Sequence, residues 1–74
     1  MDEKGVPIND LIHFLLSKDF VAGDLYHTHI GYEHPDVRTT QFQSMDIVPP
    51  FIVFNCLDQA ELDYMDFFNF LERL

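Results

Sequence analysis

The sequence predicts a small α+β domain in which three mainly antiparallel strands form a sheet and two helices pack on one face of it. Amphipathic segments with a helical apolar period lie near both ends of the chain, and segments typical of strands lie between them. The expected element order is α-β-β-β-α. A chain of 74 residues has the length of one domain. We expect residues 1–6 to form a flexible lead-in and residues 7–74 to form the domain.

The first helix is predicted from Pro7 to Lys18. Proline suits the first position of a helix, and Asp10 lies in the first turn, where a negative charge complements the helix dipole. An apolar stripe with helical spacing is formed by Ile8, Leu11, Ile12, Leu15 and Leu16. Phe14 lies at the border of this stripe, where we expect partial exposure.

Two strands are predicted after Gly23. Residues 25–32 alternate in a way that directs Tyr26, Thr28, Ile30 and Tyr32 to the core and the histidines between them to solvent. Residues 33–36 are predicted to turn, since they contain a proline. Residues 37–43 then form a second, more polar strand.

The most apolar segment, Phe51–Cys56, is predicted to be a central strand. Pro49 and Pro50 before it lack backbone donors, which places them at a sheet edge or outside the sheet. A final helix is predicted to run from an N-cap at Asp58 to the C-terminus, because Glu61 follows three residues later as in a capping box. Its core face is expected to contain Leu57, Ala60, Tyr64, Phe67, Phe68, Leu71 and Leu74.

Charge restricts the possible partners. Thirteen Asp and Glu against four Lys and Arg give a formal net charge of −9. Nucleic acid and anionic lipid carry the same sign, so direct binding to either is disfavoured and a basic protein surface is favoured. The same charge also keeps a phenylalanine-rich protein dissolved, which is an alternative explanation for it.

Cellular location is predicted to be cytoplasmic. The single cysteine, Cys56, permits no internal disulfide and lies in an apolar run, which fits a buried thiol in a reducing compartment. The polar N-terminus does not resemble a signal peptide, and no apolar stretch approaches the ~20 residues that cross a bilayer.

Enzyme motifs are absent from the sequence. Gly5, Gly23 and Gly31 are isolated and form no phosphate-binding loop, and neither Ser17 nor Ser44 lies in a nucleophile elbow. We therefore predict a binding protein and not an enzyme.

The leading hypothesis is a small acidic inhibitor or modulator that covers a basic surface of a partner protein. The polar side of the last helix mixes carboxylates with apolar residues, a combination that suits protein binding. The predicted binding residues are Asp58, Glu61, Leu62, Asp63, Met65, Asp66 and Phe70.

A sharper form of this hypothesis is nucleic-acid mimicry. A helix rises about 1.5 Å per residue and B-DNA carries one charge per about 1.7 Å of axis, so spaced carboxylates can imitate phosphates. Asp58, Asp63 and Asp66 have such a spacing, and Asp46 can supplement them. In composition the chain resembles small acidic inhibitors made by mobile genetic elements.

A second hypothesis is a small metal-binding domain. His27 and His29 are two positions apart, so on one strand they project to the same face, and Glu33 or His34 can complete a site for Zn or a similar divalent metal. The spacing His-x-His-x3-Glu looks like the opening half of a cupin metal motif over seven residues, although the chain is too short for that barrel.

Two further expectations complete the sequence analysis. The apolar surplus of Phe51–Cys56 and the last helix makes a homo-oligomeric structural module, such as a dimer, a third hypothesis. Histidines among many carboxylates are expected to hold protons strongly, so binding to a basic partner should weaken between about pH 7 and 5.5.

Overall fold

The computed structural model describes residues 1–26 and 28–74, without the side chains of residues 24–26, and confirms the α+β class. A three-stranded antiparallel sheet has the order β2-β3-β4, and a separate two-stranded sheet pairs β1 with β5. The elements are β1 (Val6–Pro7), α1 (Ile8–Ser17), β2 (Val21–Tyr26), β3 (His29–Glu33), β4 (Thr39–Gln43), β5 (Ile47–Val48), α2 (Pro50–Ala60) and α3 (Tyr64–Glu72).

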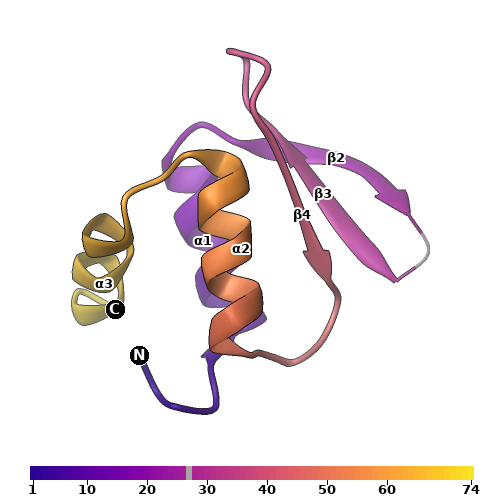
Figure 1. Cartoon of the computed structure of the whole chain (residues 1–74). Coiled ribbons are helices and arrows are strands. Elements are labelled where there is room, and N and C mark those ends of the chain that lie inside the picture. The colour runs from indigo at the N-terminus through magenta and orange to yellow at the C-terminus, as the bar shows by residue number, and fades with distance from the viewer. Residues whose placement is uncertain (27) are drawn as a thin grey trace.

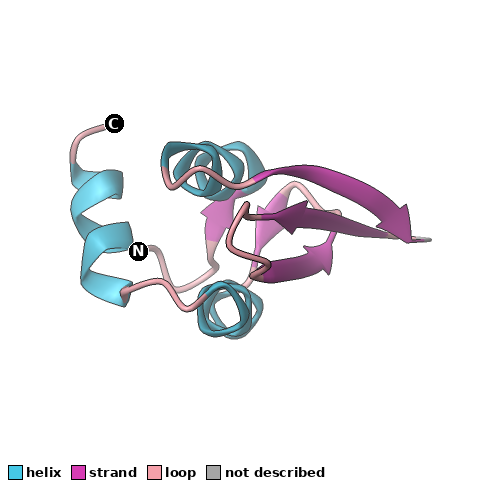
Figure 2. Cartoon of the chain, turned by 90° about the horizontal axis from the view of Figure 1, so that it is seen from above, coloured by secondary structure: helices cyan, strands magenta, loops and turns pink. Residues whose placement is uncertain are grey.

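Three layers make up the molecule. The sheet forms one side, and α1 and α2 lie together on one of its faces, α1 beside β2 and α2 beside β4 (Figures 1 and 2). Helix α3 lies on the far side of these two helices from the sheet (Figure 2). Two helices thus cover one face of the sheet as predicted, but the second of them is α2, whose segment was predicted to contain a strand, and the C-terminal helix α3 lies behind the pair.

The N-terminal segment is anchored at its last residue. Val6 is buried and pairs with Val48 in the antiparallel β1–β5 ladder. Gly5 adopts a positive φ of 120°, and a side chain there would collide with the carbonyl oxygen of Val48. Of the lead-in expected over residues 1–6, Gly5 and Val6 thus pack into the fold.

Helix α1 forms where it was predicted, with Pro7 immediately before its first residue. The exposure of two side chains differs from expectation. Phe14 is buried because α3 packs on its side of the helix, where its ring meets Phe67 edge-on at 5.0 Å between centroids and Phe70 at 5.3 Å. Leu16, expected in the buried stripe, is about half exposed.

The strand predicted over residues 25–32 is wrong: a turn divides that segment into the end of β2 and most of β3. Tyr26 pairs with His29 and Leu25 with Ile30, so the chain reverses between positions 26 and 29. The sequence here has no Gly or Asn of the kind that usually marks a hairpin. The alternation of residue types typical of a strand therefore continues without interruption.

Strands β3 and β4 otherwise match the predicted alternation. Tyr32, Thr40 and Phe42 are buried on the helix-covered face, and Tyr32 pairs with Thr40 across the ladder. The turn expected at residues 33–36 is present and lies slightly later, closed by hydrogen bonds from the His34 N–H to the Arg38 carbonyl and from the Val37 N–H to the His34 carbonyl.

The central strand predicted at Phe51–Cys56 is wrong, because this segment is the first half of helix α2. Pro50 occupies the first turn of the helix, a position where a missing N–H costs nothing. The buried residues Val53, Cys56, Leu57 and Ala60 follow helical spacing. Additional apolar residues on the other sides of the helix concealed this period in the sequence.

The single final helix starting at Asp58 is also wrong. Helix α2 continues through Asp58 and ends at Ala60, where Glu61 takes a left-handed conformation with a φ of 56°. Helix α3 has its N-cap at Asp63, whose Oδ1 accepts hydrogen bonds from the N–H groups of Met65 at 2.7 Å and Asp66 at 3.3 Å. The capping box was expected five residues too early.

Arg38 joins the β3–β4 turn to the end of α2. Its Nη1 donates to the Ala60 carbonyl oxygen at 2.8 Å, which gives a cation and a donor to the helix C-terminus. Its Nε donates to Asp36 Oδ2 at 2.8 Å, and its guanidinium lies over the Phe20 ring at 5.3 Å from the centroid. The turn, the helix end and the core are thus connected by one side chain.

Val37 is strained at the tip of this turn. It is a β-branched residue with a φ of 74°, and 88% of it is exposed. It occupies a left-handed position in this turn, which Gly or Asn normally fills. No buried contact offsets this strain.

Replacing Val37 with Asn should therefore stabilise the domain. Asn adopts the left-handed conformation more readily, so we expect V37N to raise the free energy of unfolding by about 1 kcal/mol in urea denaturation. The matched control is V21N, on an exposed position of strand β2, where Asn should give no gain. A V37N variant no more stable than the wild type would contradict the strain.

Candidate functional site

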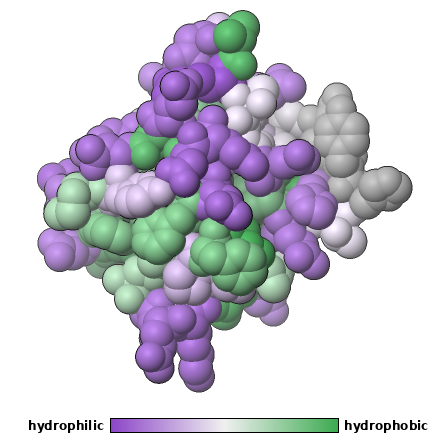
Figure 3. Space-filling view, in the orientation of Figure 1, coloured by the Kyte–Doolittle hydropathy of each residue, from purple (hydrophilic) through white to green (hydrophobic). Residues whose placement is uncertain are grey.

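The candidate site is an exposed aromatic face on α2 and α3. The core-facing side of α2 is completely buried, so the remaining apolar side chains of this helix point outward or toward α3. Figure 3 shows the apolar surface continuing across both helices, with hydrophilic surface above and below it. We define the aromatic face by the four residues Phe51, Phe54, Tyr64 and Phe68.

Three of the four rings are in contact through Phe54, and Phe51 lies next to Phe54 on the same helix. Phe51 and Phe54 are three residues apart on α2 and hence neighbours on one side of it. The Phe54 ring lies 4.8 Å from that of Tyr64 and 6.3 Å from that of Phe68, measured between centroids. Phe51 is 67% exposed and Tyr64 is 38% exposed, while Phe54 and Phe68 are half-buried. Aromatic side chains of both α2 and α3 thus face solvent.

Carboxylates border the aromatic face. Asp58 lies one turn after Phe54 on α2, Glu72 lies one turn after Phe68 on α3, and the exposed Glu61 ends α2. The Tyr64 hydroxyl donates to Asp58 Oδ1. This hydrogen bond, together with desolvation and the carboxylate charge, raises the pKa of Tyr64. The phenol is therefore held neutral and fixed at the acidic border.

The residues predicted to bind a partner do not all share this surface. Asp58 and Glu61 border the aromatic face, whereas Leu62 is half-buried against the core. Asp63 caps α3 with its carboxylate. Leu62 and Asp63 therefore have structural roles in the fold.

The rest of the predicted set lies on other sides of α3. Met65 and Asp66 are exposed, and Asp66 forms an ion pair with Lys18 of α1 at 3.4 Å. Phe70 is half-buried and its ring packs edge-on against Phe14. Phe51 and Phe54 were missed because their segment was predicted to be a strand. Tyr64 and Phe68 were predicted to lie in the core, and only their aromatic character pointed to a role in binding.

The predicted metal ligands are only partly covered by the structure. His27 lies outside the described residues. His29 and Glu33 are exposed at opposite ends of β3, and His34 pairs through Nδ1 with Asp36 at 2.9 Å. Among the residues that the structure describes, no three His, Cys, Asp or Glu side chains are grouped as metal ligands. Metal binding stays a prediction.

The single cysteine of the sequence is buried. Cys56 lies on the core side of α2, and its carbonyl oxygen accepts a hydrogen bond from the Thr40 hydroxyl at 3.0 Å. Burial raises the pKa of the Cys56 thiol from 9.0 to about 11, although the neighbouring Thr40 hydroxyl acts in the opposite direction. At neutral pH this group has almost no thiolate character.

The folded protein should accordingly be unreactive toward a thiol reagent such as dithionitrobenzoate at about pH 8. The free energy of unfolding should also fall between about pH 9 and 11, by about 2–3 kcal/mol in total, because the unfolded thiol loses its proton first. A C56A variant should lack this part of the pH dependence. Rapid labelling of the folded chain would contradict the burial of the thiol.

Comparisons with known proteins give no family. No protein-family model matches the chain, and no curated protein matches it. No helix in the described part of the chain is long and apolar enough to span a bilayer.

Proposed function

We propose that the chain is a small acidic protein-binding module that covers a basic surface of a partner protein through the aromatic face of α2 and α3. The observation that carries this proposal is the aromatic face itself, which is partly exposed and bordered by carboxylates. Aromatic side chains are enriched at the centres of protein interfaces, and a polar rim surrounds such centres.

Charge favours a basic partner over a second copy of this chain. Two copies each with a formal net charge of −9 repel one another, whereas a basic surface is attracted and steered. Asp58, Glu61 and Glu72 are placed to meet cations around the edge of the contact. The aromatic rings would then provide the burial that slows dissociation.

The role in the cell that fits this chemistry is inhibition or modulation of the partner. A basic surface on a protein is often one that binds nucleic acid, so covering it would block that binding. Full mimicry of a phosphate row is a narrower form of the proposal. The structure distributes Asp58, Asp63 and Asp66 over α2, its link to α3 and α3 itself, and mimicry stays a prediction.

The proposal predicts that F51S loses partner binding while the fold is kept. The side chain is largely exposed, so its loss costs little stability, but an exposed aromatic anchor commonly contributes more than tenfold to affinity. Capture experiments with the tagged full chain, followed by mass spectrometry, identify candidates. Calorimetry with the purified candidate then compares wild type and variant, and we expect binding at least about tenfold weaker.

The matched control is L16S, which removes a similarly sized exposed apolar side chain from α1. It should bind like the wild type, and added salt should weaken binding by the wild type. Equal affinity of F51S and the wild type would place the interface elsewhere. Concentration-dependent dimerisation abolished by F51S would instead assign the aromatic face to self-association and overturn the proposal.

A further inference from the structure

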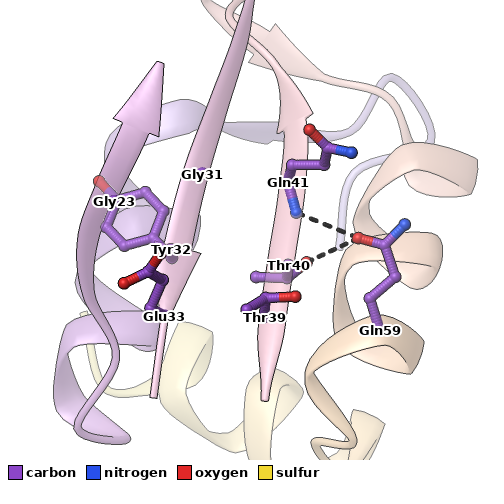
Figure 4. A pocket seen from close by; sticks show the side chains of 8 residues that line it. All are labelled: Gly23, Gly31, Tyr32, Glu33, Thr39, Thr40, Gln41 and Gln59. Atoms are coloured by element: carbon purple, nitrogen blue, oxygen red, sulfur yellow. Dashed lines mark hydrogen bonds between the residues drawn. The ribbon is translucent and has the colours of Figure 1, made fainter. Parts of the chain in front are cut away.

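A second concave surface lies along the three-stranded sheet, where the last turn of α2 adjoins the edge of β4. A cavity of about 460 Å³ is bounded by residues of β2, β3, β4 and α2. Figure 4 shows it as a trough that crosses the sheet between Glu33 on one side and Gln41 and Gln59 on the other. The lining residues are Gly23, Gly31, Tyr32, Glu33, Thr39, Thr40, Gln41 and Gln59.

Two glycines leave room for this trough. Gly23 of β2 and Gly31 of β3 both lie inside strands, where glycine weakens a sheet and often marks a place that another group approaches closely. A side chain at Gly23 would meet the carboxyl group of Glu33, with the added Cβ 3.2 Å from Oε1. The absence of that side chain lets the Glu33 carboxylate lie over the sheet beside the trough.

Glu33 has no cationic partner within the described part of the chain. The ion pairs there join Lys18 to Asp66 and Arg38 to Asp36, and the His34 ring lies against the same Asp36. The carboxylate of Glu33 is therefore a negative charge at the trough whose hydrogen-bonding capacity the described residues do not use. A cation that enters the trough can form charge-assisted hydrogen bonds with it.

The opposite wall is held in place by α2. Gln59 Oε1 accepts a hydrogen bond from the Gln41 N–H at 3.1 Å, and it shares the Thr40 hydroxyl proton, also at 3.1 Å, with the Cys56 carbonyl oxygen (Figure 4). These bonds fix the Gln59 amide at the edge of β4. The Thr39 hydroxyl and the Gln41 side-chain amide add further acceptors to the lining.

We infer that this trough binds a guanidinium group. A guanidinium is flat, has five N–H donors and accepts no hydrogen bond, so it suits a glycine-floored trough with a free carboxylate and neutral oxygens. Either a free guanidinium compound or an arginine side chain of another protein can supply it. The inference does not depend on the aromatic face, because the trough and that face have no residue in common.

The test is a titration of the full-length ¹⁵N-labelled chain with agmatine, followed by NMR. We expect saturable shifts of the Gly31 and Gln41 amides and of the Gln59 side-chain amide. E33Q should weaken binding at least about tenfold, whereas E3Q, an equal loss of charge at the exposed N-terminus, should change it less than about twofold.

Two further arms complete the experiment. In N-acetylcitrulline amide an uncharged urea group replaces the guanidinium of arginine, so this compound should not saturate the trough. Tighter binding of an arginine-containing peptide than of agmatine would assign a partner's side chain as the occupant, and the reverse order would assign a free small molecule. No saturable shifts with either cation, or equal losses in E33Q and E3Q, would overturn the inference. F51S should bind agmatine normally, which separates this site from the proposed partner interface.

Discussion

A helix can bury only one side of itself against a core, and the segment from Phe51 to Ala60 has more apolar residues than one side can contain. Val53, Cys56, Leu57 and Ala60 are buried by the sheet and α1. Phe51 and Phe54 are left over on the opposite side. The character of this surface depends on how far the rest of the chain covers these two side chains.

Helix α3 covers part of that surplus. Its own apolar side is divided between two neighbours: Phe67 and Phe70 pack on Phe14 of α1, while Tyr64 and Phe68 pack on Phe54. Phe51 remains mostly exposed. Full burial of one such side chain is worth about 1.5–3 kcal/mol, so an exposed ring beside other rings is an unused source of binding energy.

The sequence predicted those elements that bury one clean face. Helix α1 and strand β4 show their apolar periods directly, and so their positions were close to correct. The α2 segment has apolar residues on nearly every side, and a short apolar segment such as Phe51–Cys56 does not distinguish a buried strand from a helix. The β2–β3 turn was missed because its flanks continue the strand alternation, and the start of α3 because Asp58 and Glu61 have the spacing of a cap.

The candidate sites follow from tertiary placement more than from motifs. Aromatic residues of α2 and α3 meet only because the chain turns back at Glu61, and Gly23 and Gly31 form a trough only because their strands are neighbours in the sheet. The net charge was readable from the sequence, and the proposal of a basic partner surface rests on it. The sequence did not show which carboxylates border a surface and which belong to a helix cap or an ion pair. That distinction depends on the fold.

The most direct test of this account is the solvent exposure of individual phenylalanine rings, measured by NMR with a soluble paramagnetic relaxation agent. Cα chemical shifts over residues 50–60 should be helical. The ring protons of Phe51 should relax strongly, and those of Phe14 and Phe67 should be protected. Strand-like shifts in this segment, or a Phe51 ring as protected as Phe14, would contradict the claim that α2 leaves an aromatic surface open for a partner.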